Sequence, residues 1–194
     1  MAKELSEMTL KELWQLFPVV LKEYNDAYPD WYEIEKRRLI DLIGEGDIFR
    51  INHIGSSAVK GMLAKPTVDI LLELNEEIDL NEISHKISNR GWILMSSQEK
   101  PYKSRVFNKG YTKQGFAEKV YHLHVRYAGD WNELYFRDYL NDSKEAAEKY
   151  AVLKLELIKK FRDDRDGYTD AKSDFILYCT EHARKKYGGR YKVK

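Results

Sequence analysis

The sequence predicts an α+β (mixed α/β) fold built on a mixed sheet of about five strands, with flanking helices and a helical C-terminal segment. Apolar residues recur at helical spacing in residues 1–46, short alternating or apolar runs fill residues 47–128, and helical periodicity returns over residues 129–194. Strands and helices do not alternate strictly, which argues against a doubly wound dinucleotide fold. We therefore expect a single domain over residues 1–194, composed of N-terminal helices, a sheet core and C-terminal helices.

The N-terminal segment predicts two helices. Thr9 and Glu12 have the spacing of a capping box, and apolar residues follow at helical spacing. Pro18 lies inside this run and is expected to kink or split the helix. A second helix is expected to begin near Pro29 and to end at the glycines that precede the first strand.

The central and C-terminal segments predict the sheet and three further helices. Strands are expected at residues 48–54, 67–74, 92–95, 103–108 and 119–127, with a helix over 79–90 and a loop containing Gly110 and Gly115 between the last two strands. Helices are expected near 131–141, 143–161 and 170–187, with the last two separated by Asp-Arg-Asp-Gly at 164–167. The dense charges of residues 142–166 are expected to form a solvated helical surface.

Composition excludes several classes of function. Lys+Arg is 33 and Asp+Glu is 32, so the net charge of +1 provides no global field for a long nucleic acid, and any preference for anions must be local. No signal peptide and no apolar run of membrane-spanning length is visible, so we expect a cytoplasmic protein without a membrane partner. The one cysteine, Cys179, lies among apolar helical residues and is expected to fill the core rather than act as a nucleophile.

One short stretch, HIGSSAVKGMLAKPTVDILLEL at residues 53–74, concentrates the chemical signals. A strand that ends in Gly55-Ser56-Ser57 can form a phosphate cradle, because glycine lets the backbone approach a ligand while hydroxyl and N–H groups donate to its oxygens. Lys65 supplies a further donor. The alternative is an ordinary strand-to-helix turn capped by a serine.

Asp69 is an unusual residue within this stretch. It lies in the apolar run Thr-Val-Asp-Ile-Leu-Leu, where both faces of the strand look buried and an unpaired carboxylate is costly. Such a residue persists when it binds a cation, an arginine or backbone donors. The alternatives are a buried salt bridge or an aspartate that reaches solvent at the strand end.

The motif HIGSSAVKGMLAKPTVDI closely resembles the signature of the GrpB-like family, HxGSTSVxGLxAKPxxDI. Further matches follow in order at R-V-F (105–107), H-L-H-V (122–125), L-x-F-R-D-Y-L (134–140), K-Y-x-x-L-K (149–154) and R-x-x-Y-T-D-A-K-S-D-F (165–175). The resemblance implies the nucleotidyltransferase superfamily, in which the Gly-Ser turn and an acidic strand of a mixed sheet form the active site. A related domain is fused to dephospho-CoA kinase in plants and some bacteria, which points to nucleotide or coenzyme A metabolism.

The sequence departs from the catalytic pattern of nucleotidyltransferases at Leu71. Those enzymes place two carboxylates two residues apart on one strand, about 6.6 Å from each other, where both can bridge two Mg²⁺ ions. Here the next acid on the face of Asp69 is Glu73, about 13 Å along the strand. His122 and His124 alternate on a later strand and could complete a site with Asp69 if that strand neighbours the strand of Asp69. Such a site favours Zn, Mn or Fe over Mg. Alternatively, the histidines bind phosphate or hydrogen-bond Asp69 without a metal.

Three other basic residues have two interpretations each. His53 orients the Gly-Ser turn or fills the strand end. Arg105, with Lys103 on the same strand face, neutralises phosphate charge or lies on a solvated face. Arg137 reaches the site or braces its helix against the sheet, and we favour bracing.

The leading hypothesis is a nucleotidyltransferase-like enzyme that binds a small nucleotide or phosphate ligand with a divalent metal, Mg or Mn with Zn as an alternative. The residues assigned to the phosphate are Gly55, Ser56, Ser57, Lys65 and Arg105, and those assigned to the metal and to catalysis are Asp69, His122 and His124. A second hypothesis, favoured by Leu71, is a catalytically degenerate binder of a nucleotide or phosphate. A third is a metal-dependent hydrolase with an Asp/His site.

Overall fold

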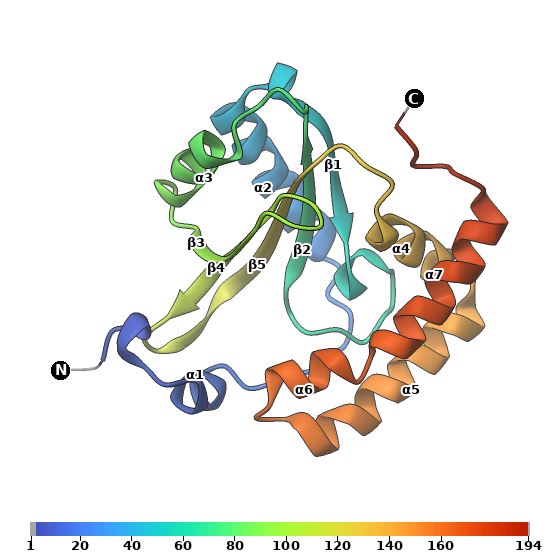
Figure 1. The fold of residues 1–194 in the computed structure, drawn as a ribbon. Helices are drawn as coiled ribbons and strands as arrows, with labels where there is room; N and C mark the ends of the chain where they lie inside the picture. Colours follow the sequence, from blue (N-terminus) through green and yellow to red (C-terminus); the bar gives the residue numbers. More distant parts are fainter. Residues whose placement is uncertain (1–2, 194) are drawn as a thin grey trace.

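The computed structural model describes residues 3–193 and contains a five-stranded mixed sheet flanked by two groups of helices (Figure 1). The strands are β1 (Ile48–Ile54), β2 (Val68–Leu74), β3 (Ile93–Gln98), β4 (Ser104–Thr112) and β5 (Gly115–Tyr127), in the order β1-β2-β5-β4-β3. The α+β fold and the five strands are therefore confirmed. Residues 1, 2 and 194, at the ends of the predicted segments 1–46 and 129–194, lie outside the described residues.

The helices divide between the two faces of the sheet (Figure 1). Their bounds are α1 (Leu10–Leu16), α2 (Tyr28–Ile43), α3 (Leu80–Ser88), α4 (Asn132–Asp142), α5 (Lys144–Phe161), α6 (Arg165–Asp170) and α7 (Ser173–Tyr187), with short 3-10 turns η1 (Leu5–Glu7), η2 (Glu45–Asp47) and η3 (Ser56–Ala58). Helices α2 and α3 bury their apolar sides against one face. Helix α4 packs on the other face, and α5 and α7 pack on α4. Within residues 3–193 no helix is both long enough and apolar enough to cross a membrane.

Strands β2 and β5 are parallel, and their register positions the candidate site. Asp69 of β2 lies opposite His122 of β5. Because side chains alternate between the faces of a strand, Ile70 enters the core beneath α2 and α3, whereas Asp69 and Leu71 face the side of α4. There Leu71 packs against Leu134 of α4. The sheet therefore separates a large apolar core from a polar face.

Helix α1 is shorter than predicted. The capping box of Thr9 and Glu12 is present, but the helix ends at Leu16 instead of continuing through Pro18. Proline has no N–H to donate, and its ring clashes with the preceding turn of a helix. The chain that follows is not helical, and Val19 donates its N–H to a carbonyl just past the end of α5. Pro18 thus ends the helix rather than kinking it.

Strands β4 and β5 run further than predicted and form one long hairpin. The fourth strand was expected to end at residue 108, with Gly110 and Gly115 in a loop. Instead Gly110 lies within β4 at a φ of 91°, and a Cβ there would lie 2.3 Å from the Lys119 carbonyl oxygen. The pairing shifts between Lys109 and Tyr111, which is a β-bulge. Gly110, which we took as evidence for a loop, is therefore a strand residue, and the backbone conformation at the bulge requires glycine there.

A second difference lies at residues 164–167, predicted as a break between helices. Asp164 accepts a hydrogen bond from the N–H of Gly167 at 2.8 Å and so caps a short helix, α6. The Asp-Arg-Asp-Gly sequence therefore starts a helix, because an N-cap aspartate satisfies a free backbone donor. This places Arg165 at the first turn of α6.

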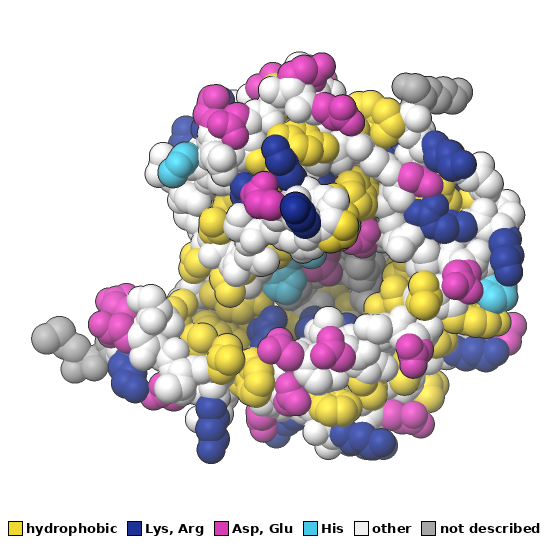
Figure 2. Space-filling view, viewed as in Figure 1, with side chains coloured by type: hydrophobic (Ala, Val, Ile, Leu, Met, Phe, Trp, Pro, Cys, Tyr) yellow, Lys and Arg dark blue, Asp and Glu magenta, His cyan; other side chains and the backbone are white. Residues whose placement is uncertain are grey.

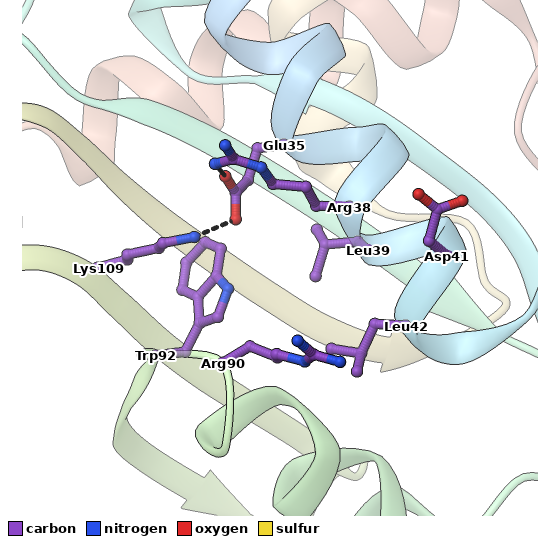
Figure 3. Close-up of a pocket in the computed structure, with 8 residues that line it drawn as sticks. All are labelled: Glu35, Arg38, Leu39, Asp41, Leu42, Arg90, Trp92 and Lys109. Carbon is purple, nitrogen blue, oxygen red and sulfur yellow. Dashed lines mark hydrogen bonds and ion pairs between the residues drawn. The ribbon is translucent and has the colours of Figure 1, made fainter.

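A buried ion pair ties α2 to β4 on the face opposite Asp69. Glu35 is 1% exposed, and its two carboxylate oxygens bind Lys109 Nζ at 2.5 Å and an Arg38 guanidinium nitrogen at 3.1 Å. These residues line a cavity of about 410 Å³, and Lys109 also lies over the ring of Trp92 (Figure 3). The buried Glu35 carboxylate is therefore shared by two cations of the protein.

Candidate functional site

A cleft of about 580 Å³ opens between the sheet and the C-terminal helices. Figure 2 shows this hollow, with histidine, Lys or Arg, and acidic side chains inside it. The cleft is bounded by the β1–η3 turn, the start of β2, the middle of β5, helices α4, α5 and α6, and the start of α7. The predicted site residues that line it are Gly55, Ser56, Ser57, Lys65, Asp69, His122 and His124.

The Gly-Ser turn lies directly against the Asp69 carboxylate. Ile54, the last residue of β1, pairs with Asp69 of β2. Gly55 then adopts a φ of 70°, and a Cβ at this position would lie 2.3 Å from Asp69 Oδ2. Both the backbone conformation and the space therefore require glycine here.

Asp69 begins a chain of hydrogen bonds that joins four elements, β2, β5, β4 and α6. His122 Nδ1 lies 3.0 Å from Asp69 Oδ1, and His122 Nε2 lies 2.7 Å from the hydroxyl of Tyr111 on β4. That hydroxyl accepts a hydrogen bond from Arg165 of α6 at 2.9 Å. With Asp69 ionised, His122 donates from Nδ1 and accepts from Tyr111 at Nε2. Both ring nitrogens of His122 are thus occupied.

The surroundings of Asp69 keep it ionised. Burial alone would raise the pKa of Asp69, but the hydrogen bond from His122 and the charges of His122, His124 and Lys65 hold this pKa below its ordinary value. Burial lowers the pKa of His124, so this imidazole is neutral at pH 7. The cleft therefore has one fixed negative charge on its floor.

His53 orients the Gly-Ser turn. Its Nε2 lies 3.0 Å from Ser57 Oγ, and its ring stacks on Tyr32 of α2 with centroids 5.0 Å apart. Burial lowers the pKa of His53 to about 4, so the ring is neutral and can fix the hydroxyl of Ser57. Of the two interpretations, orientation of the turn is the one that this contact supports.

Four cationic side chains form the wall of the cleft that faces Asp69. They are Lys65 before β2, Lys154 of α5, Arg165 of α6 and Lys172 just before α7. Lys154 is 2% exposed and donates to the carbonyl oxygen of Leu63 and to Ser56 Oγ. We call these four residues the basic wall.

Burial disfavours the charge of the three lysines of the basic wall. Burial and the neighbouring cations lower the pKa of Lys65 to about 7 and that of Lys154 to about 7, and burial lowers the pKa of Lys172. Lys65 Nζ and Lys172 Nζ lie 5.0 and 4.6 Å from the centroid of the Tyr168 ring. The Tyr168 hydroxyl is buried and has no hydrogen-bond partner among the described residues.

Arg105 does not join the site. It pairs with Val125 across β4 and β5, so it lies on the face opposite His122 and His124. Its guanidinium donates to a carbonyl of β3 and to the Asn81 side chain at the start of α3. The assignment of Arg105 to phosphate is therefore corrected: alternation along β4 directs this side chain away from the cleft.

Arg137 braces α4 against the sheet, as expected. Its guanidinium donates to the Asn52 side chain and to the His53 carbonyl oxygen of β1, and it also pairs with Asp138. Cys179 is 1% exposed and packs in the core between α4, α5 and α7. Burial raises the pKa of this thiol to about 11, which agrees with core filling.

The residues around Asp69 do not match the carboxylate pair of a two-metal site. Leu71 occupies the position of the second acid, and Glu73 is fully buried in a bidentate pair with Arg50. Asp69, His122 and His124 do lie together at the floor of the cleft. Within residues 3–193, however, no group of three or more His, Cys, Asp or Glu side chains is arranged to hold a metal ion.

From the sequence we assigned Lys65 to the site but missed the other three residues of the basic wall. Two of these, Lys154 and Arg165, lie within residues 142–166, where we expected a solvated helical surface, and for them that expectation is wrong. A signal was present in the sequence. Lys154 continues the buried stripe formed by Ala146, Tyr150 and Leu157, a core position where lysine is rare. Lys154, Arg165 and Lys172 also fall within the quoted family motifs.

Comparison with known proteins establishes the family. The family model described as GrpB protein matches residues 18–182. The chain belongs to the GrpB family. The glutamate-rich protein GrpB of Alkalihalophilus pseudofirmus is 33% identical over 162 residues, covering 81% of this chain and 91% of that protein. The UPF0157 protein YqkA of Bacillus subtilis is 27% identical over 187 residues, and the match spans 93% of this chain but 52% of that relative.

Solved structures agree with this membership. The conserved protein GrpB from Enterococcus faecalis superposes with a TM-score of 0.75 at 26% identity, over 87% of this chain and 99% of that chain. The Cid1 poly(U) polymerase bound to Mg 3′-dATP superposes with a TM-score of 0.50 at 9% identity, over 84% of this chain and 51% of that chain. The second likeness shows that this chain has a nucleotidyltransferase-like fold, which it shares with about half of that polymerase.

Proposed function

We propose that this member of the GrpB family binds the phosphate groups of a nucleotide, or of a small phosphate ligand, in the cleft. The observation that carries the proposal is the basic wall. Lys154 is buried, and Lys65 and Lys172 are half-buried near it, an arrangement that is unfavourable without an anion. A phosphate group neutralises them and accepts charge-assisted hydrogen bonds from them.

The Gly-Ser turn supplies the opposite side of the proposed phosphate site. Gly55 brings the backbone close to the ligand, and Ser56 Oγ already lies 3.2 Å from Lys154 Nζ. Lys65 and Lys172 lie against the ring of Tyr168, which holds the two ammonium groups near each other. This combination of ammonium groups and hydroxyls suits an oxyanion better than a neutral ligand.

The fold supports a nucleotide as the carrier of the phosphate. The cleft lies at the β1–η3 turn and β2, where the resemblance to nucleotidyltransferases implies a nucleotide site. Leu71 replaces the second carboxylate of those enzymes. This departure favours binding over nucleotidyl transfer, so binding is the activity to test first.

Isothermal titration with ATP, GTP, CTP and UTP tests the proposal. Wild type is compared with Lys172→Ala and with Lys185→Ala, which removes an exposed lysine of α7 outside the cleft. A hydrogen bond to a charged group contributes about 1.5–3 kcal/mol, so we expect Lys172→Ala to bind about 10- to 100-fold more weakly. Lys185→Ala should bind like wild type. Equal affinity in all three proteins, or no binding at all, would refute the proposal.

A further inference from the structure

We propose that the basic wall takes the place of divalent metal ions, so that the phosphate ligand binds in the cleft without a metal. This inference rests on the proposed function and makes it more specific. It starts from a disagreement between the fold and the residues: the fold is that of nucleotidyltransferases, but the side chains around Asp69 do not form their metal site.

The ligands available for a metal are few. Asp69 is the one carboxylate of β2 that faces the cleft, since Glu73 is held by both of its oxygens to Arg50. Both ring nitrogens of His122 are engaged, one by Asp69 and the other by Tyr111. Binding a metal through His122 would break one of these two contacts. Glu133 also lines the cleft, but its carboxylate pairs with Arg126 at 2.8 Å. The groups left at the floor are therefore one carboxylate oxygen of Asp69 and His124, which are too few ligands for a tightly held ion.

Positive charge is already present where a metal would act. The charge of Lys65 stabilises ionised Asp69, and Asp69 in turn favours the protonated form of Lys172. The carboxylate therefore faces ammonium groups across the cleft. A metal ion placed at Asp69 would be repelled by these cations as well as attracted by the carboxylate.

The donors of the basic wall also match what a metal does for a phosphate. Lys154 lies at Ser56 on one side of the cleft, and Lys65 and Lys172 flank Tyr168 on another. Arg165 adds a guanidinium that already orients Tyr111. Together these groups can neutralise phosphate oxygens from several directions and supply hydrogen bonds, which is the electrostatic part of metal action.

Titration with ATP in EDTA and in excess Mg²⁺ tests the inference, using wild type, Lys154→Met and Asp69→Asn. Met matches the length of the lysine stem, and circular dichroism shows whether each variant folds. We expect wild type to bind ATP in EDTA within about threefold of its affinity in Mg²⁺, and Lys154→Met to bind about 10- to 100-fold more weakly in both. Asp69→Asn removes the carboxylate that a metal would need, so we expect this variant to bind ATP with the same affinity in EDTA and in Mg²⁺.

The outcomes separate the two proposals. Binding that needs Mg²⁺ and is lost in Asp69→Asn would overturn the metal-free inference while leaving the proposed function intact. Absence of ATP binding in both media would overturn both. If Lys154→Met does not fold, Lys172→Gln carries the same test from a half-buried position at the start of α7, with the same expected loss in EDTA.

Discussion

Raising the pH from 6 to 8 is expected to weaken anion binding in the cleft about 100-fold. The pKa values of Lys65 and Lys154 lie at about 7 in the free protein. The protonated fraction of each lysine then falls from about 0.9 to about 0.1 across this range. Because a bound anion requires both to be protonated, each contributes about tenfold, and together they contribute about 2.7 kcal/mol.

Sulfate is the ligand of choice for this measurement, because its charge is constant over the range whereas phosphate and ATP themselves titrate near pH 7. Affinity is measured by isothermal titration at pH 6, 7 and 8 at fixed ionic strength. A second series in a buffer of different ionisation enthalpy reports how many protons are taken up on binding.

The matched variant is Lys154→Arg, which keeps the charge but does not titrate in this range. Its affinity should fall only about tenfold between pH 6 and 8, since Lys65 alone still titrates. Sulfate affinity that does not change with pH in wild type would refute the reasoning. A fall of the same size in Lys154→Arg as in wild type would show that Lys154 is not one of the titrating groups.

Three further predictions concern stability. Between pH 7 and 9 the ligand-free protein should gain about 2.3 kcal/mol of unfolding free energy from Lys154, because the unfolded lysine, with its pKa near 10.5, binds more protons there than the folded one. Unfolding in urea measures this gain, and a stability that falls over this range would contradict it. Gly55→Ala should lower Tm by about 4 °C or more, given its φ of 70°, whereas the control Gly46→Ala, which has open space, should not. Lys109→Met should lower the free energy of unfolding by about 3 kcal/mol, because it leaves the buried Glu35 carboxylate without its closer partner. Adding Glu35→Leu should restore most of this stability. An equal loss in the double variant would argue against the ion pair as the cause.

Local patterns were sufficient to predict part of the site. The glycine of the Gly-Ser turn and the aspartate in an apolar strand are unusual within a few residues of chain, so their importance is visible without knowledge of the fold. The pairing of Asp69 with His122 was anticipated only on the condition that their strands are neighbours. Strand order depends on contacts distant in sequence, and β2 and β5 are separated by about 40 residues of chain.

The errors share a cause: the face on which a side chain lies was judged without its partners. Arg105 was assigned to the cleft because it is basic and lies on a strand, but its register with Val125 places it on the other face. Lys154 was read as solvated because its neighbours in sequence are charged, although helical spacing places it with Tyr150 and Leu157. The residues next to a lysine or arginine in the sequence do not show which anion, if any, its side chain faces in the folded protein.

The bulge at Gly110 fixes how many residues β4 must have between Lys109 and Tyr111. Lys109 contacts Glu35 on the α2 side of the sheet, whereas Tyr111, two residues later, bonds to His122 on the cleft side. Regular alternation would send both to the same side. The residue count through the hairpin is therefore as important as the identity of Tyr111. An insertion or deletion of one residue there would move Tyr111 to the other face and so break the link between Arg165 and His122. The sequence would nevertheless still contain all four residues of the hydrogen-bond chain.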